Sequence, residues 1–223
     1  MDSVTFAALS AALALLADAT RAPAMSSYMR GRFAFLGIPR PALRAAAKPV
    51  LKELRAQSGV DWDFVDACWG ADEREYQYVA LDYLVAVRGR LSAADVPRLR
   101  ALAQSKAWWD SIDVLDKVVG DIALRDPSVN DVLRTWARDE DFWLRRIAID
   151  HQRGRKTHTD TELLAEIIEA NFGSSEFFIN KAIGWALRDY SKTNPDWVGV
   201  FVDAHRAEMA PLSVREASKY LQA

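Results

Sequence analysis

Cysteine and histidine are scarce in this sequence. Its 223 residues contain a single cysteine, Cys68, so no disulfide framework is possible and an oxidising compartment is not implied. The three histidines, even together with that cysteine, show no zinc-binding spacing. We interpret them as ordinary structural or surface residues and expect no metal site.

An excess of charge of one sign is also missing. The chain has 29 lysines and arginines against 31 aspartates and glutamates, which gives a formal net charge of −2. This total neither suggests nor excludes a nucleic acid. Any polyanionic partner would have to be held by a local basic patch.

The Ala-rich apolar run at residues 5–17 is too short to span a bilayer. It lacks the basic start of a signal peptide and carries Asp2 in front. We interpret it as a buried helix, with a signal peptide as the alternative. We therefore expect a cytoplasmic protein with no membrane partner.

Proline and glycine are sparse and stand between periodic stretches. Alternation typical of β-strands is almost absent, whereas apolar residues at the helical period occur nearly everywhere. Ser92 and Asp160 stand where helix N-caps are expected. The segment "FLGIPRP" (35–41) predicts that one helix ends at Gly37 and the next begins near Pro41. About a dozen helices joined by short turns predict an all-α fold.

An internal repeat of 34 residues supports this prediction. It relates four short segments, "VALD" (79–82), "DVLD" (113–116), "IAID" (147–150) and "KAIG" (181–184). The register aligns Asp82, Asp116, Asp150 and Gly184, and also Glu75, Trp109, Trp143 and Phe177. A fixed period of this length is typical of stacked helical pairs. We predict one domain over residues 1–223, a curved α-solenoid whose concave face is built from one helix of each pair.

The first candidate site lies on the predicted helix 107–124. Its core stripe is Trp108, Ile112, Leu115, Val119 and Ile122. Trp109 and Asp113 fall on a different stripe, one turn apart. They either form a functional pair or are a half-buried tryptophan beside a helix-capping or salt-bridged aspartate.

The second candidate site lies on the predicted helix 176–192. Trp185 shares a stripe with three cations, Lys181, Arg188 and Lys192. The tryptophan could stack on a base or a sugar while the cations bind phosphates. The alternative is a tryptophan that lies on the neighbouring repeat among solvated cations.

Two further basic regions complete the candidates. Arg146 lies mid-helix near the face of Asp113, where it could hold a phosphate through two N–H groups or belong to a solvated charge run. In the N-terminal part, Tyr28 and Arg40 accompany a strip of cations on one helix, Arg44, Lys48, Lys52 and Arg55. Local positive charge therefore exists despite the negative total.

Five stretches of the chain resemble the AlkD-type DNA alkylation repair family. They are "YMRGRFAFLGIPRPALR", "WWDSIDVLDKVVGDIAL", "WLRRIAIDHQ", "EFFINKAIGWALRDYSKTNPDWV" and "LSVREASKYL", in that order. The resemblance covers roughly residues 24–222. It implies a HEAT-like helical repeat protein of a bacterial type, with a concave basic face.

The resemblance also implies roles for particular residues. The active-site tryptophans and aspartate of the family match Trp109, Trp185 and Asp113, which makes these the expected catalytic residues. A motif arginine matches Arg146, and the tyrosine of the "YM" motif matches Tyr28. The full set of expected DNA-binding residues joins these two to the cations chosen from spacing: Arg146, Tyr28, Arg188, Lys181, Lys192 and Arg40.

The activity that the resemblance implies is hydrolysis of the N-glycosidic bond of cationic N3- or N7-alkylpurines in duplex DNA, without a base-flipping pocket and without strand cleavage. It requires no cofactor. We expect a monomeric base excision repair enzyme that works at the nucleoid. Two alternatives stay open. One is a non-catalytic relative that binds DNA by its shape, and the other is a protein-interaction scaffold.

Overall fold

The computed structural model describes residues 4–221 and divides the chain into two compact units, Met1–Leu91 (unit 1) and Ser92–Ala223 (unit 2). Apart from one isolated β-bridge between Ala34 and Glu73, the regular structure of the described residues is helical. The prediction of an all-α fold is therefore confirmed. Among the described residues, no helix combines the length and apolar character needed to cross a membrane.

The described residues of unit 1 form five α-helices and one short 3-10 helix. In unit 1, α1 packs against α3 and α4, and α5 packs against α3 and α4. The elements are α1 (Val4–Ala14), α2 (Ala22–Tyr28), α3 (Arg40–Ala56), α4 (Trp62–Gly70), α5 (Arg74–Val87) and η1 (Arg88–Arg90).

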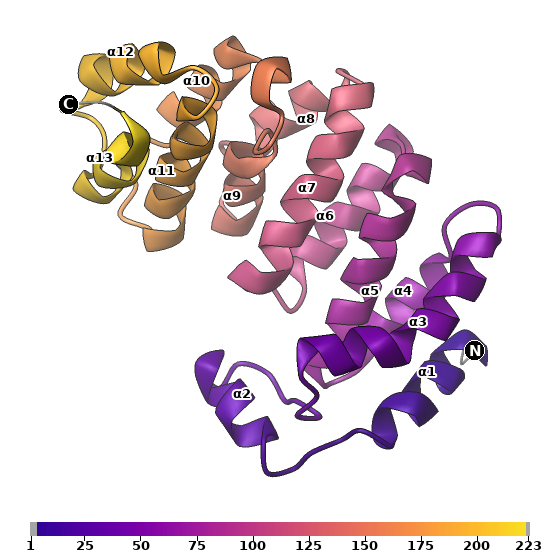
Figure 1. The fold of residues 1–223 in the computed structure, drawn as a ribbon. Helices are drawn as coiled ribbons and strands as arrows, with labels where there is room; N and C mark the ends of the chain where they lie inside the picture. The colour runs from indigo at the N-terminus through magenta and orange to yellow at the C-terminus, as the bar shows by residue number, and fades with distance from the viewer. Residues whose placement is uncertain (1–3, 222–223) are drawn as a thin grey trace. The chain divides into compact units, whose positions relative to one another are not determined.

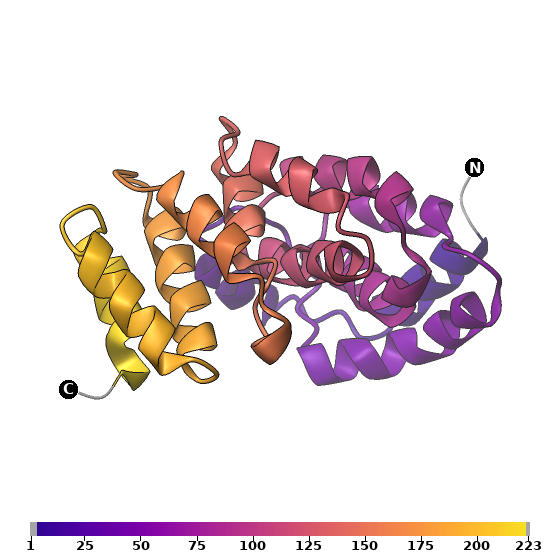
Figure 2. The same ribbon diagram turned by 90° about the horizontal axis from the view of Figure 1, so that it is seen from above.

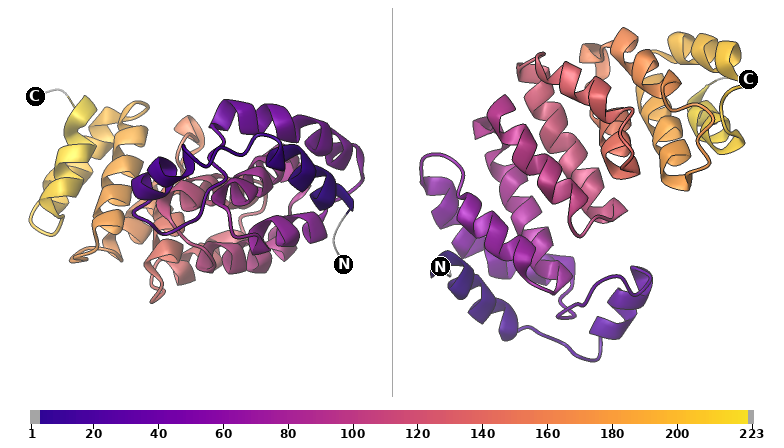
Figure 3. Two further views of the ribbon diagram at one scale, coloured as in Figure 1. Left: turned by 90° about the horizontal axis from the view of Figure 1, so that it is seen from below. Right: turned by 180° about the vertical axis from the view of Figure 1, so that it is seen from behind.

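Unit 2 consists of two layers of helices (Figures 1 and 2). In one layer, α7, α9, α11 and α13 lie side by side, and in the other, α6, α8, α10 and α12 pack against them. Figure 3 shows the same layers from below and from behind. The elements are η2 (Ala93–Asp95), α6 (Val96–Gln104), α7 (Trp109–Arg125), α8 (Val129–Trp136), α9 (Phe142–Asp150), η3 (Lys156–His158), α10 (Thr161–Glu169), α11 (Phe177–Ser191), α12 (Pro195–His205), α13 (Pro211–Ala217) and η4 (Ser218–Tyr220).

The helical repeat is confirmed by where equivalent helices begin. Helices α5, α7, α9 and α11 start at Arg74, Trp109, Phe142 and Phe177, close to the predicted period. The predicted core stripe of α7 is buried along its whole length, from Trp108 to Ile122. That all of 1–223 forms one domain, curved and with one concave basic face, stays a prediction.

Short polar side chains begin the helices as predicted. The carboxylate of Asp160 accepts a hydrogen bond from the backbone N–H of Leu163 at 3.0 Å and caps α10. Ser92 forms a capping box with Asp95 at the start of η2. These caps satisfy backbone N–H groups that have no partner within the helix.

The prediction that a helix ends at Gly37 is wrong. Helix α2 already ends at Tyr28, and Gly37 lies in the loop before α3 with φ +87°. The reason is the buried carboxylate of Glu75, which accepts the backbone N–H groups of Leu36, Gly37 and Ile38 at 2.9–3.1 Å. A Cβ on Gly37 would also collide with the backbone carbonyl of Asp18.

The interpretation of 5–17 as a buried helix is only partly right. Helix α1 stops at Ala14, and within it only Leu9 and Leu13 are buried. Leu15, just beyond it, is 87 % exposed. Alanine is small and has high helix propensity, so this segment is helical while little of its surface is buried.

Candidate functional site

The two adjacent tryptophans at the start of α7 have different environments. Trp108 has an extended backbone at the N-cap position and is buried edge-on against Trp143 and Phe178, with ring centroids 5.8 and 5.3 Å apart. Trp109 begins the helix and is only half-buried. Because Asp113 follows one turn later, Trp109 and Asp113 lie on the same side of α7, as predicted from the spacing.

Asp113 is held by Arg146 from the neighbouring helix α9. The Nε and Nη2 groups of Arg146 both donate to Oδ1 of Asp113, at 2.9 and 2.8 Å. Its Nη1 group donates to the backbone carbonyl of Phe178 at 2.8 Å. The side chain of Arg146 is 2 % exposed and that of Asp113 is 18 % exposed. Arg146 therefore fixes a carboxylate that still reaches the surface.

These contacts change how Arg146 is interpreted. The sequence suggested that its guanidinium binds a phosphate, but in the structure the guanidinium is buried and donates to Asp113 and Phe178. A bidentate phosphate contact would require these bonds to break. The register placed Arg146 one residue away from alignment with Asp113. It still reaches Asp113, because an arginine side chain is long enough to cross between adjacent helices.

Two further carboxylates lie behind Asp113. Asp116 and Asp150 are both fully buried, and carboxylate oxygens of all three aspartates lie within 4.8 Å of one another. Arg153 donates to Asp116 at 2.8 Å and lies 3.4 Å from Asp150, while Arg146 lies 3.7 Å from Asp150. Three acidic groups thus share two guanidinium groups in a site that is largely closed to water.

Burial and crowding change the proton affinity of this cluster. Burial raises the pKa of Asp150 to about 6, even though Arg153 and Arg146 oppose the rise. Burial, together with repulsion from Asp150 and Asp113, also raises the pKa of Asp116 well above its usual value. The guanidinium groups of Arg146 and Arg153 compensate part of the negative charge of the three carboxylates.

Trp185, on α11, is surrounded by cations. Four of them lie 5.1–5.7 Å from its ring centroid, within the range of cation–π attraction: Arg146, Arg153, Lys181 and Arg188. The first two come from the adjacent helix α9 and the turn that follows it, which the spacing along α11 could not reveal. Arg146 thus contacts Asp113 and lies near Trp185, and it connects the two candidate sites.

The predicted cation stripe on α11 is divided between different partners. Lys181 and Arg188 both form ion pairs with Glu216 of α13, at 3.0 and 2.7 Å. Lys192 lies over the ring of Tyr220, 5.2 Å from its centroid, and not over Trp185. The hydrogen bond from Lys219, reinforced by Lys181, lowers the pKa of the Glu216 carboxyl to about 2.

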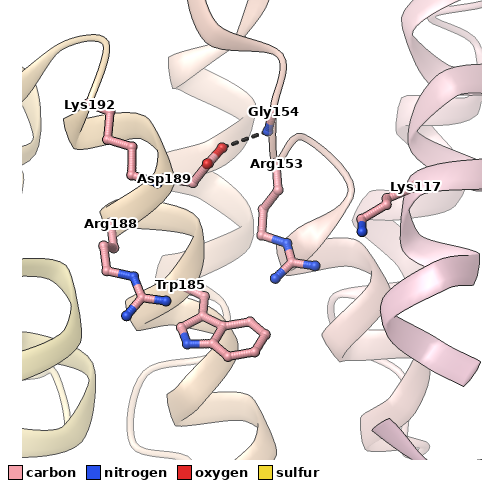
Figure 4. A pocket seen from close by; sticks show the side chains of 7 residues that line it. All are labelled: Lys117, Arg153, Gly154, Trp185, Arg188, Asp189 and Lys192. Carbon is pink, nitrogen blue, oxygen red and sulfur yellow. Dashed lines mark hydrogen bonds between the residues drawn. The ribbon is translucent and has the colours of Figure 1, made fainter. Parts of the chain in front are cut away.

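An open pocket of about 330 Å³ lies where α7, the turn after α9 and the end of α11 meet (Figure 4). Its lining combines the Trp185 ring with four cations and one acid: Lys117, Arg153, Gly154, Trp185, Arg188, Asp189 and Lys192. The carboxylate of Asp189 accepts a hydrogen bond from the backbone N–H of Gly154 at 2.6 Å, which ties the turn to α11.

The candidate residues of unit 1 have a different setting. Tyr28, the last residue of α2, is largely exposed. Arg40, the first residue of α3, pairs with Asp82 at 2.9 Å and lies 4.8 Å from the ring centroid of Tyr78. The strip of cations on α3 is solvent-exposed at Arg44, Lys48, Lys52 and Arg55, as its spacing predicts.

The sequence did not identify the residues that support the site. Asp116 and Asp150 entered only as marks of the repeat. The available signal was the repeat, which places both aspartates at equivalent positions at the ends of apolar segments. Nothing in the sequence pointed to Glu216.

The fold and site define an all-helical repeat protein with a buried ion-pair network beneath a partly exposed aspartate and two tryptophans. The family model described as DNA alkylation repair enzyme matches residues 9–221. The chain therefore belongs to the DNA alkylation repair enzyme family, as the resemblance predicted.

Solved structures agree with this assignment. A predicted DNA alkylation repair enzyme from Enterococcus faecalis is 37% identical, with a TM-score of 0.84 over 92% of this chain and 96% of that chain. AlkD2 from Streptococcus mutans is 15% identical, with a TM-score of 0.60 over 81% of this chain and 100% of that chain, and this likeness shows the fold alone. A search of curated proteins found no significant match.

Proposed function

We propose that the protein is a monofunctional DNA glycosylase that removes cationic N3- or N7-alkylpurines from duplex DNA. The observation that carries the proposal is the Asp113 carboxylate. It is anchored through one oxygen by the buried Arg146 and is still partly exposed. Trp109 lies one turn before it on α7, and the guanidinium of Arg146 lies 5.5 Å from the centroid of the Trp185 ring. Membership of the DNA alkylation repair enzyme family supports the choice of damaged DNA as substrate.

The chemistry fits a fixed carboxylate. When the bond between C1′ and the purine nitrogen breaks, its electron pair leaves with the base, and the cationic purine departs as a neutral molecule. Positive charge develops on the deoxyribose, where a carboxylate stabilises it and orients water. Water then forms the new bond at C1′ and loses a proton, which leaves an abasic site.

Arg146 has a positioning role in this proposal. Both of its bonds to Asp113 use Oδ1, so neither occupies Oδ2. A preorganised carboxylate stabilises developing charge more effectively than a mobile one, because little reorganisation is needed during the reaction. The faces of Trp109 and Trp185 would pack against the sugar and the cationic lesion.

The test is a single-turnover assay with a duplex that holds one 7-methylguanine. Asp113→Asn should reduce excision by about 10²–10³-fold, as deletions of electrostatic stabilisation do. Asp121→Asn is the matched control on the same helix. Asp121 pairs with Arg125 one turn later, and its substitution should leave excision unchanged.

Three results would reject the proposal. Excision of uracil or of neutral ethenoadenine at the rate for 7-methylguanine would remove the dependence on a cationic leaving group. DNA binding without excision by the wild type would favour a non-catalytic relative that recognises DNA shape, and no DNA binding at all would favour a protein-interaction scaffold.

We further propose that the protein acts as a monomer at the nucleoid.

A further inference from the structure

Trp185 lies between two cations that are held by one carboxylate. Lys181 lies one turn before Trp185 on α11 and Arg188 one turn after it, so all three share one side of the helix. The two cations lie 5.6 and 5.7 Å from the centroid of the indole ring, and Figure 4 shows the Arg188 guanidinium beside it. Both cations pair with Glu216 of α13, at 3.0 and 2.7 Å. Glu216 therefore joins the two ends of the stripe across Trp185.

The residue that precedes Trp185 lets α13 come this close. Gly184 stands in the repeat slot that aspartates occupy in the three preceding segments. A Cβ on Gly184 would collide with the Cβ of Glu216. The hydroxyl of Ser213 also donates to the backbone carbonyl of Asn180 at 2.8 Å, which ties α13 to α11. The last repeat thus has a glycine in place of its own aspartate, and the next helix supplies the carboxylate.

Glu216 has the properties of a fixed anchor. Its side chain is buried. The hydrogen bond from Lys219, reinforced by Lys181, lowers the pKa of its carboxyl to about 2, so the group is ionised at neutral pH. A cation that is bound to such a carboxylate loses most of its rotamer freedom. Lys181 and Arg188 are therefore restrained on either side of Trp185.

The indole ring of Trp185 has no hydrogen bond to fix its orientation. Its Nε1 group is buried and donates to none of the described residues. The orientation of the ring therefore depends on packing and on the cations that surround it. Restrained cations hold the ring better than mobile ones.

We propose that Glu216 is a positioning residue for Trp185, whose ring it holds in place through Lys181 and Arg188. The inference rests on the proposed function, because that function places Trp185 against the reacting nucleotide. It deepens the proposed function, since it gives α13 a part in excision. Glu216 itself does not touch the reacting atoms.

A Glu216 that only fastened α13 to α11 would behave differently. Its loss would then lower stability, DNA affinity and excision together. If Glu216 positions Trp185, its loss should slow excision and leave the affinity for an undamaged duplex equal or higher. The reason is that Lys181 and Arg188 lose their compensating carboxylate, and positive charge favours binding of a polyanion.

The first test compares Glu216→Gln with Lys219→Gln, in single-turnover excision of 7-methylguanine and in binding of an undamaged duplex. Glu216→Gln keeps the size of the side chain and should slow excision by about 10–100-fold, as small misplacements in a reaction site do. Lys219→Gln is the matched control, because Lys219 binds the same carboxylate at 2.9 Å from η4, outside α11. It should excise at the wild-type rate. Glu216→Asp keeps the charge and should recover part of the lost rate.

A second readout requires neither DNA nor excision. In protein labelled with fluorotryptophan, the fluorine resonance of Trp185 is identified by its absence in Trp185→Phe. This resonance should shift or broaden in Glu216→Gln and stay unchanged in Lys219→Gln. Thermal unfolding of each variant shows whether the fold is kept. If Glu216→Gln did not fold, the double variant Lys181→Gln, Arg188→Gln should move the same resonance.

Three results would overturn the inference. The first is excision by Glu216→Gln at the rate of Lys219→Gln. The second is a joint fall of excision, DNA affinity and melting temperature in Glu216→Gln. The third is an unchanged Trp185 resonance in the folded Glu216→Gln or in the double variant. A wild type that excises nothing would reject the glycosylase proposal, whereas the fluorine spectrum would still decide whether Glu216 holds Trp185.

Discussion

The same position of the repeat is occupied by Asp82 in unit 1 and by Asp150 in unit 2, yet the two carboxylates are solvated very differently. Asp82 is 23 % exposed and pairs with Arg40, which is itself partly exposed. Asp150 is fully buried, between Arg146 and a second guanidinium group. Exposed ion pairs contribute little to stability, whereas buried charges depend strongly on their partners. The difference shows that one repeat position can hold a solvent-exposed ion pair in unit 1 and a buried carboxylate that supports the candidate site in unit 2.

A second pair of equivalent positions differs in the same way. Glu75 in unit 1 is buried and holds the loop before α3 through three backbone N–H groups. Trp109 in unit 2 occupies the equivalent position, where it is half-buried at the start of α7. The repeat therefore sets where a helix begins, while the neighbouring elements decide what the first side chain does.

The sharpest test of this comparison removes one arginine from each unit. Arg146→Met should destabilise the protein by about 3–5 kcal/mol, because Asp113 and Asp150 lose a buried partner. Arg40→Met should cost at most about 1 kcal/mol, since its pair with Asp82 stays in contact with solvent. Urea denaturation measures both free energies of unfolding. Equal losses would mean that burial does not distinguish the two ion pairs.

Measuring the free energy of unfolding at several pH values tests the buried member of this comparison, Asp150. Folding raises the pKa of Asp150 from 3.8 to about 6, so the folded state binds its proton more tightly than the unfolded chain. Through this group alone, stability should decrease by about 3 kcal/mol as the pH rises from about 4 to about 6. The raised pKa of Asp116 gives a decrease of the same sign. Asp150→Asn should therefore remove only the part of the decrease that belongs to Asp150, which denaturant unfolding at several pH values will show.

In the same experiment, Glu216 should change stability with pH in the opposite direction to Asp150. Its folded pKa is lowered from 4.5 to about 2, so its contribution to stability is complete above pH 4.5 and is lost as the pH falls toward 2. Glu216→Gln should therefore flatten the acid limb of the stability curve and leave the decrease between about pH 4 and 6 in place. If Asp150→Asn and Glu216→Gln changed the stability curve in the same pH range, the two pKa assignments would be contradicted.

The carboxylate of Glu75, which holds the loop before α3 in unit 1, should make the next smaller contribution to stability. Glu75→Gln keeps the size of the side chain but replaces one acceptor oxygen with a donor group that faces backbone N–H groups. We expect a loss of about 1.5–3 kcal/mol, as for buried hydrogen bonds to a charged group. Glu73→Gln is the matched control, because Glu73 makes no capping hydrogen bond. Denaturation of both variants, with limited proteolysis of the loop at 29–39, would separate them.

Two glycines of unit 2 give the smallest differences. A Cβ at Gly120 would collide with the backbone carbonyl of His151, whereas one at Gly199 would meet nothing within 4 Å. Gly120→Ala should therefore cost about 1–3 kcal/mol. Gly199→Ala, inside α12, should be neutral or gain up to about 1 kcal/mol, because alanine favours the helix. Thermal unfolding that ranks the two the other way would contradict the close approach of α7 to His151.

Local sequence patterns were enough to predict several features of this protein. The apolar period identified the helices and the buried stripe that begins at Trp108. The constant spacing of short segments identified the repeat, and short polar residues such as Asp160 identified helix starts. The apolar period also separated Trp108 from Trp109, because it places Trp108 on the core stripe and Trp109 on a different stripe. Each of these features depends on residue types and their spacing along the chain.

Only the tertiary structure decided which charged groups meet. The pairing of Arg146 with Asp113, the burial of Asp150 and the capture of Lys181 and Arg188 by Glu216 all depend on how adjacent helices pack. Periodicity places a side chain on a face, but it does not say which partner reaches that face or how much water remains there. The electrostatic energy of a charge depends on both, so the properties of the candidate site follow from packing between helices and not from the pattern along any one of them.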